Sequence, residues 1–117
     1  MNVEEYRLYC LSLNGVTEDF PFDQQVLAFR VGGKIFALAD IFDFVSVNLK
    51  CDPEKAIQWR ELYAGVTPGF HMNKKHWNTV LTDGSVPVKV LHEMIRDSYT
   101  LVFRSLPKSI REGMEAG

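Results

Sequence analysis

Two adjacent glycines, Gly32 and Gly33, separate two runs of alternating side chains, VLAFRV and KIFALA. The tight turns that join antiparallel strands need positive φ at their central residues, and glycine adopts that region without steric strain. The stretch 26–39 therefore predicts a β-hairpin with Gly32-Gly33 as its turn. A hairpin of this kind restricts the chain to folds that contain an antiparallel sheet. With a regular register, Phe29 lies opposite Phe36 on the neighbouring strand.

The same alternation predicts which face of the sheet is buried, because successive side chains of a strand point to opposite sides. The large apolar side chains of the hairpin share one face: Leu27, Phe29, Phe36 and Leu38. The opposite face carries Arg30, Ala28 and Ala37. The segment 44–50, FVSVNLK, continues this pattern and predicts a third strand whose polar face holds Ser46, Asn48 and Lys50. A sheet with one apolar face predicts helices on that face and an opposite face that stays partly open.

Helical spacing and capping residues predict the helices. An amphipathic helix is expected over 2–13. A second helix begins at Asp52-Pro53, since Asp is a preferred N-cap and Pro fits the first turn, and runs to about Tyr63. A long helix is expected over 85–106, and its inner stripe is Leu91, Ile95, Ser98 and Val102.

Residues 69–81 predict two more short strands around Asn73-Lys74-Lys75. The polar connection TEDFPFDQQ is expected to pack Phe20 and Phe22 against the body. The element order is then helix, three strands, helix, two strands, helix. This order predicts one α+β domain over residues 1–117, built on an antiparallel sheet.

Composition narrows the class of protein. The chain has 117 residues and a formal net charge of -2, and no apolar run approaches the roughly 20 residues needed to span a bilayer. Its N-terminus is acidic where a signal peptide would be basic, and its two cysteines, Cys10 and Cys51, form no disulfide pattern. We therefore expect a cytoplasmic protein without a membrane partner, as a monomer or a weak dimer.

Bases, imidazoles and a tryptophan gather in the segment TPGFHMNKKHWNTV, residues 67–80. No acid lies between Glu61 and Asp83. The segment's candidate contact residues are His71, Lys74, Lys75, His76 and Trp77. One interpretation is a hairpin tip whose lysines meet phosphates and whose tryptophan stacks on a base. The other is an ordinary turn, with solvated lysines and a tryptophan that caps the core.

Catalytic and metal signatures are weak in this sequence. No serine stands in a nucleophile elbow and no glycine-rich loop is shaped for phosphate. Cys51 precedes a helix N-terminus, where the dipole lowers a thiol pKa, but Asp52 beside it opposes that effect. His71 and His76 are two imidazoles without a third ligand. We therefore expect neither catalysis, nor a metal site, nor a cofactor.

Several stretches together resemble the MmcQ/YjbR family of small bacterial proteins. They run from about residue 18 to residue 111 and read FPFD, VGGKIFAL, VNLKCDPEKA, GVTPGFHMNKKHWNTV, SYTLVF and LPKSIR. The resemblance implies the same helix and strand order that the periodicity predicts. Proteins of this family are compared with frataxin-like and secretion-chaperone-like folds. The family is labelled DNA-binding, with a "double wing" motif, so the resemblance implies a nucleic-acid partner.

The double-wing motif of the family makes two hairpin tips candidate contacts with nucleic acid, and we call these tips wings. The first wing would contain Arg30 and Lys34, with Lys50 beside them, and the second would be the 69–81 hairpin. At most four or five phosphates could be neutralised, which predicts weak binding with a moderate salt dependence. The alternative is a protein-interaction or chaperone-like adaptor that uses the open sheet face. One continuous basic surface would favour nucleic acid, whereas separation of the bases by apolar surface would favour a protein partner.

Overall fold

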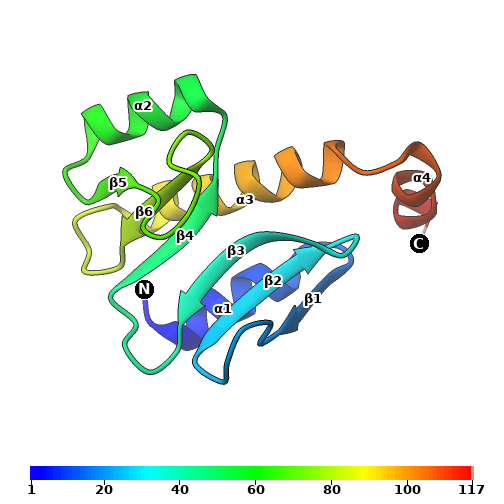
Figure 1. The fold of residues 1–117 in the computed structure, drawn as a ribbon, viewed down its shortest axis with the longest axis horizontal. Helices are drawn as coiled ribbons and strands as arrows, with labels where there is room; N and C mark the ends of the chain where they lie inside the picture. Colours follow the sequence, from blue (N-terminus) through cyan, green and yellow to red (C-terminus); the bar gives the residue numbers. More distant parts are fainter. Residues whose placement is uncertain (117) are drawn as a thin grey trace.

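The computed structural model describes residues 1–116 and contains a six-stranded antiparallel sheet with the strand order β1-β2-β3-β4-β6-β5 (Figure 1). The predicted α+β class is confirmed. The strands are β1 (Val16–Asp19), β2 (Val26–Val31), β3 (Lys34–Asp40), β4 (Ser46–Lys50), β5 (Val66–Pro68) and β6 (Trp77–Leu81). The helices are α1 (Val3–Ser12), α2 (Pro53–Leu62), α3 (Val88–Arg104) and α4 (Lys108–Ala116).

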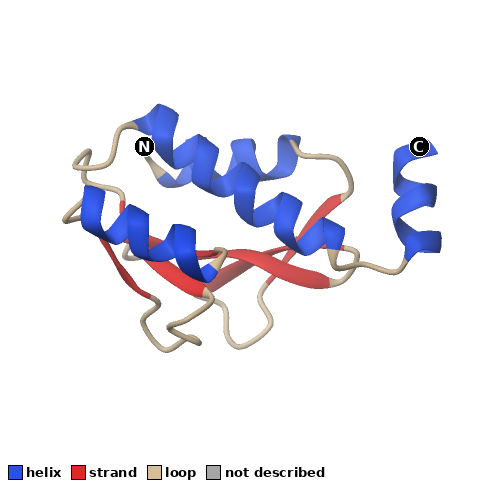
Figure 2. Ribbon diagram, turned by 90° about the horizontal axis from the view of Figure 1, so that it is seen from above, coloured by secondary structure: helices blue, strands red, loops and turns tan. Residues whose placement is uncertain are grey.

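The sheet has one face covered by helices and one open face. Figure 2 shows α1, α2 and α3 on one side of the sheet, whereas loops project from the other side. The predicted inner stripe of the long helix is confirmed, because Leu91, Ile95, Ser98 and Val102 are all buried on α3. Among residues 1–116, no helix is both long and apolar enough to cross a membrane.

The glycine turn forms as the sequence predicts. Gly32 and Gly33 have φ values of 58° and 83°, and Val31 pairs with Lys34 across the turn. Arg30 pairs with Ile35, as a regular register requires. From Phe29 onward the predicted register is wrong, because a β-bulge lies between Phe29 and Arg30 and Phe29 pairs with Ala37 instead of Phe36.

The bulge changes which hairpin side chains are in the core. Phe36 is the extra residue of the bulge, so Phe36 and Ala37 both join the cluster between sheet and helices. Leu38 then lies opposite Asn48 and points to the open face, where we predicted Ala37. The bulge therefore adds an apolar side chain to a face that the sequence predicts to be small or polar.

Two further segments differ from the sequence prediction. Val16–Asp19 is the edge strand β1, although residues 17–19 were predicted as part of a connection, and its polar residues suit an edge with one side in solvent. The predicted hairpin 69–81 is also wrong in detail. Its strands are β5 and β6, and the basic residues lie in the loop 69–76 between them. This loop projects from the open face of the sheet.

Candidate ligand-binding groove

A groove of about 500 Å³ lies on the open face of the sheet, under the loop that contains Phe22 and the loop 69–76. Its floor is formed by β3 and β4, which place Leu38 and Asn48 side by side. The remaining lining residues come from the ends of β2, β3 and β4 and from the connections around them. They are Phe22, Val26, Ala39, Asp40, Asp43, Val45, Ser46, Phe70, His71 and Met72.

Exposed apolar side chains border this groove. Phe22 is 72% exposed, Phe70 is 66% exposed and Val45 is 58% exposed. The prediction that Phe22 packs against the body is therefore wrong, and Phe20 is exposed as well. Large apolar side chains that are left in solvent around a concave surface are typical of an interaction site.

The charge on the groove wall is negative. Asp40 accepts hydrogen bonds from the backbone N–H groups of Asp43 and Phe42, both at 2.9 Å, and from the Gln25 amide. These bonds, that from Asp43 foremost, hold the pKa of Asp40 below its usual value, so the carboxylate stays ionised at neutral pH. Asp43 also lines the groove, whereas no lysine or arginine within residues 1–116 does. This surface suits a cation and repels phosphate.

The loop 69–76 is fixed to the sheet beside the groove. The Gly69 N–H donates to the Trp77 carbonyl at 2.8 Å, and the Phe70 N–H donates to the Thr79 hydroxyl at 2.9 Å. That hydroxyl donates in turn to Asn48 Oδ1 at 2.6 Å. His71, the next residue, has a φ of 57°, which is uncommon for a residue with a side chain. A strained residue held by a pinned loop is a feature of binding sites.

The predicted contact residues of the second wing lie at the edge of this loop. Lys50 on β4, which we predicted beside the first wing, is the cross-strand partner of Trp77 on β6, so the two side chains leave the same face of the sheet next to each other. Lys75 is exposed, but Lys74 donates through Nζ to the Gly69 carbonyl at 3.1 Å within its own loop. His76 is half-buried, and its carbonyl accepts from the Cys51 N–H.

The first predicted wing lies elsewhere. The Arg30 guanidinium donates to Asp19 Oδ1 at 2.8 Å and to the Gly33 carbonyl at 2.9 Å, so its charge is already paired. Lys34 is exposed at the β2–β3 turn, which lies at the right of Figure 1, far from the loop between β5 and β6. The structure therefore does not join Arg30 and Lys34 to the basic residues of the second wing.

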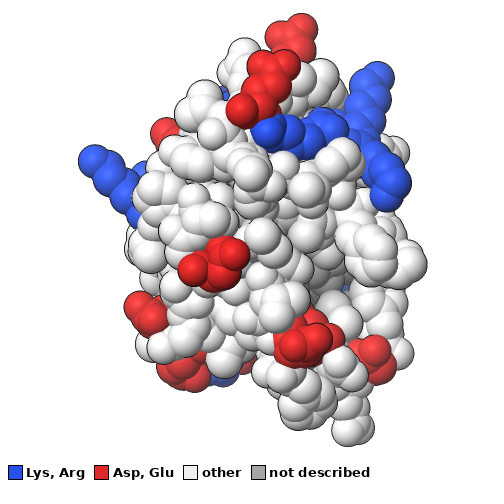
Figure 3. Space-filling view, turned by 90° about the vertical axis from the view of Figure 1, so that its left-hand side faces the viewer, with Lys and Arg blue, Asp and Glu red and all other residues white. Residues whose placement is uncertain are grey.

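Figure 3 shows the molecule from the end that carries α2 and β5. Lys and Arg side chains gather toward the upper edge of this view, and the surface below them is mostly uncharged with separate acidic side chains. In this view acidic side chains stand among the upper bases, and the bases do not form one continuous surface.

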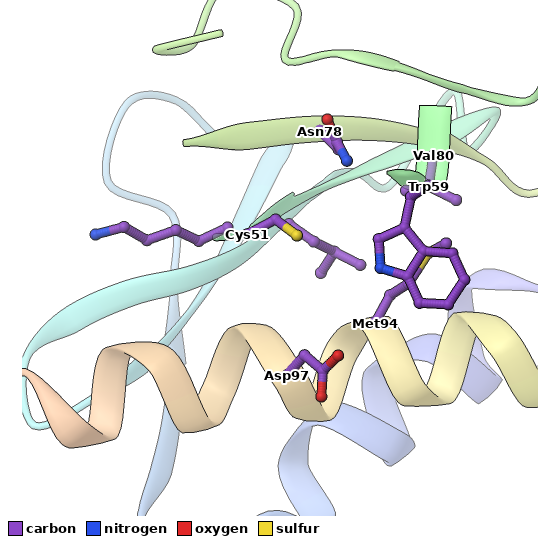
Figure 4. A pocket seen from close by; sticks show the side chains of 8 residues that line it. Cys51, Trp59, Asn78, Val80, Met94 and Asp97 are labelled. Carbon is purple, nitrogen blue, oxygen red and sulfur yellow. The ribbon is translucent and has the colours of Figure 1, made fainter. Parts of the chain in front are cut away.

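A second, smaller cavity lies on the helix side of the sheet, between α2, α3 and the strands β4 and β6 (Figure 4). Cys51 is on its wall and is 8% exposed. Burial raises the pKa of the Cys51 thiol to about 11, and Asp97 and Asp52 act in the same direction against the nearby Lys55.

Within residues 1–116, no three His, Cys, Asp or Glu side chains gather into a group that could hold a metal ion.

Sequence reasoning missed most of the residues that line the groove. Asp40 is the last residue of β3, and Asp43 and Met72 belong to connections. Nothing in the local pattern predicts that these segments meet over one face. The available signal was the pair of aromatic residues in FPFD. Two phenylalanines in a short polar connection are either packed against the core or exposed, and exposed ones indicate an interaction surface.

Comparisons with known proteins show which family this chain belongs to. The sequence profile of the YjbR family matches residues 11–101. The protein YbdF of Escherichia coli O157:H7, described as uncharacterized, is 35% identical over 115 residues, which cover 97% of this chain and 94% of YbdF. The likewise uncharacterized YjbR of Escherichia coli K12 is 30% identical over 113 residues, with 96% of each chain covered.

Solved structures agree with the sequence relatives. The crystal structure of Deinococcus radiodurans protein DR2400, a DUF419 domain, superimposes with a TM-score of 0.91 at 39% identity. It covers 97% of this chain and 88% of that one. A Pseudomonas syringae protein gives a TM-score of 0.74 at 29% identity, with 87% of this chain and 99% of that chain covered. The chain therefore belongs to the YjbR family.

Proposed function

We propose that this protein is a non-catalytic binding module that holds an extended segment of a partner protein in the groove of the open sheet face. One observation carries the proposal: a cavity of about 500 Å³ on the face without helices is bordered by exposed aromatic side chains and by carboxylates. Aromatic anchors beside a concave surface supply much of the affinity in peptide recognition.

The charges of the groove define the partner segment. Asp40 and Asp43 stand on its wall, while Phe22 and Phe70 stand at its border. An extended peptide presents alternate side chains to opposite sides, so a segment of alternating basic and apolar residues would satisfy both kinds of wall. Charge complementarity of this kind sets specificity and association rate more than total affinity.

The experiment compares two synthetic peptides by fluorescence anisotropy. One alternates lysine and leucine, and the other alternates glutamate and leucine. We expect the lysine peptide to bind and the glutamate peptide to bind at least about 10-fold more weakly, a difference of about 1.4 kcal/mol. Phe70→Ser should lower the affinity for the lysine peptide by about 10-fold, because the substitution removes an aromatic anchor.

Matched control variants distinguish binding at the groove from non-specific binding to exposed side chains elsewhere. Phe42 is 75% exposed but does not line the groove, so Phe42→Ser should leave peptide affinity unchanged. Asp43→Asn should weaken binding of the lysine peptide, whereas Glu61→Gln on the exposed side of α2 should leave that binding unchanged. If all four variants bind equally well, or if both peptides bind alike, the groove is not the binding site.

A nucleic-acid strand is the second candidate ligand, and the pairing of Lys50 with Trp77 favours it. A cation beside an indole can hold a phosphate while a base stacks, and Lys75 adds a further cation. With the first wing separate, fewer phosphates would be contacted than the sequence predicts. Lys74→Ala together with Lys75→Ala should lower the log–log salt slope of binding to DNA by roughly 2. An unchanged slope in the folded variant would exclude this loop as the contact.

A further inference from the structure

Three polar groups beside the groove form a chain of hydrogen bonds that has only one possible direction. The Phe70 N–H can only donate, so the Thr79 hydroxyl oxygen accepts from it at 2.9 Å. The single hydroxyl hydrogen of Thr79 is then available for Asn48 Oδ1, which lies 2.6 Å away. That distance is typical of an O–H···O bond and shorter than the roughly 2.9–3.0 Å that an N–H···O bond prefers. The Asn48 atom that faces Thr79 is therefore the oxygen.

This chain of hydrogen bonds fixes what Asn48 presents to the groove. Thr79 occupies the amide oxygen, so the other end of the amide is Nδ2, which has two hydrogens to donate and accepts nothing. Asn48 is half-buried and lines the groove. Its cross-strand neighbour on the other side is Leu38, which has no polar side-chain atom. A hydrogen-bond donor therefore lies on the floor of the groove beside apolar surface.

The amide donor differs in kind from the polar groups of the groove wall. Asp40 and Asp43 attract cations, whereas the Asn48 amide is neutral and requires an acceptor. A basic side chain of the ligand suits the carboxylates but cannot accept from Asn48, and an anionic acceptor would be repelled by the carboxylates. An uncharged acceptor satisfies both conditions. Every residue of a peptide supplies one, the main-chain carbonyl oxygen.

We propose that Asn48 is the residue through which this groove recognises the main chain of the bound segment. Its Nδ2–H donates to one backbone carbonyl oxygen of the peptide, while basic side chains of the peptide meet Asp40 and Asp43. Thr79 is a positioning residue, because it orients the amide but does not itself line the groove. This inference rests on the peptide-binding function proposed above and names the chemical group of the peptide that the floor binds.

The Thr79 hydroxyl also connects the amide to the aromatic border of the groove. It accepts from the backbone of Phe70, whose side chain is an exposed anchor at that border. The orientation of the donor and the position of the anchor therefore depend on one hydroxyl group. A ligand that covers Asn48 without offering an acceptor leaves a desolvated donor unpaired, which should lower its affinity by about 10-fold.

Asn48→Asp tests the donor directly, because it keeps the side-chain shape and the acceptor for Thr79 but removes the N–H group. Charge alone would make this variant bind the alternating lysine and leucine peptide more tightly. Loss of the donor should instead weaken binding by about 10-fold, measured by fluorescence anisotropy. Ser46→Asp is the matched control, since it adds a carboxylate to the groove from the same strand and leaves the hydrogen bonds of Asn48 intact. It should bind the peptide at least as tightly as the unmodified protein.

Two variants of Thr79 test its positioning role. Thr79→Val keeps the branched shape but removes the hydroxyl, so the amide is no longer held in one orientation and peptide affinity should fall several-fold. Thr79→Ser retains the hydroxyl and should retain the affinity. Chemical denaturation of both variants shows whether they are folded. Equal affinities of the folded valine and serine variants would contradict the role of Thr79.

A small acceptor probe separates this inference from the peptide-binding function. N,N-dimethylacetamide has a carbonyl oxygen and no N–H group, so it should shift the side-chain amide signals of Asn48 saturably in a ¹⁵N spectrum. Asn2 is the internal control, because its Oδ1 is likewise held, by the Glu5 N–H at 2.8 Å, but it lies outside the groove. Its signals should not saturate.

The outcomes then distinguish the two proposals. If the peptide does not bind but the probe shifts the Asn48 signals, the peptide function fails and the donor site is supported. If the peptide binds in the groove and Asn48→Asp binds it as tightly as the unmodified protein, the Asn48 inference is overturned and the groove remains the binding site. If neither the peptide nor the probe affects Asn48, both proposals are overturned.

Discussion

The Ser98 hydroxyl joins two strands that no longer pair. It donates to the Phe36 carbonyl at 2.5 Å, and the Lys50 N–H donates to it at 2.9 Å. A side chain from α3 thus replaces a ladder bond between β3 and β4, whose register ends at Ala37 and Leu49. Beyond this point the strands diverge, and Figure 1 shows the β2–β3 turn and the loop between β5 and β6 at opposite sides. This divergence is why the two predicted wings do not form one basic surface.

Ser98→Ala should destabilise the protein by about 1–3 kcal/mol, because a buried backbone donor and a buried acceptor both lose their partner. Chemical denaturation measures the change. Ser109→Ala, at an exposed site on α4, is the matched control and should be nearly neutral. Equal stabilities of the two variants would mean that the strands re-pair without Ser98.

Alanine substitutions in the glycine turn should separate the free-energy cost of backbone strain from the cost of a steric clash. Alanine at Gly33 would be strained by a φ of 83° but would meet no atom within 4 Å, so we expect a cost of about 1–2 kcal/mol. A Cβ at Gly32 would in addition lie 2.5 Å from Cδ1 of the buried Leu106. Gly32→Ala should therefore be the more damaging substitution in thermal unfolding. Similar costs would show that the turn does not pack tightly on Leu106.

Cys51 should be an unreactive thiol. With its pKa raised by burial to about 11, the thiolate fraction at neutral pH is about 100-fold smaller than at a pKa of 9.0. Its side chain is also nearly inaccessible. A thiol reagent at pH 7 should modify the folded protein far more slowly than free cysteine, and unfolding in guanidinium should restore the rate. Fast and selective modification of Cys51 in the folded state would reopen a catalytic role.

Acid should weaken the contact between α1 and α3 through His92. Its ring stacks on Tyr9 with centroids 3.9 Å apart, and desolvation together with Arg96 lowers its pKa, against the opposing effect of Glu5. The unfolded chain then binds a proton more readily than the folded one, so stability falls as the pH drops below about 6.5. His92→Phe keeps a stacked ring without a titratable group, and its stability should depend less on pH between 7 and 5. An identical pH profile would contradict this assignment.

Local sequence patterns predicted the elements well, because each depends on a few neighbouring residues. The Gly32-Gly33 turn, the Asp52-Pro53 helix start and the buried stripe of α3 all have local causes. The bulge at Phe36 was not predictable, since it depends on how Ser98 and the helix face meet the hairpin. The groove was not predictable for the same reason, because Phe22, Asp40 and Phe70 meet only after the sheet has formed.

The most direct test of the binding proposal is a ¹⁵N chemical-shift titration with the alternating lysine and leucine peptide, repeated with a short DNA duplex. We expect the peptide to shift the backbone signals of Asn48, Phe70, His71 and Met72 around the groove, and Lys75 to shift little. Signals on the outer side of α2, such as Glu61, should not move. If the peptide causes no saturable shifts in the groove, while DNA shifts Lys50, Lys75 and Trp77, the account is contradicted and these three residues mark the ligand site.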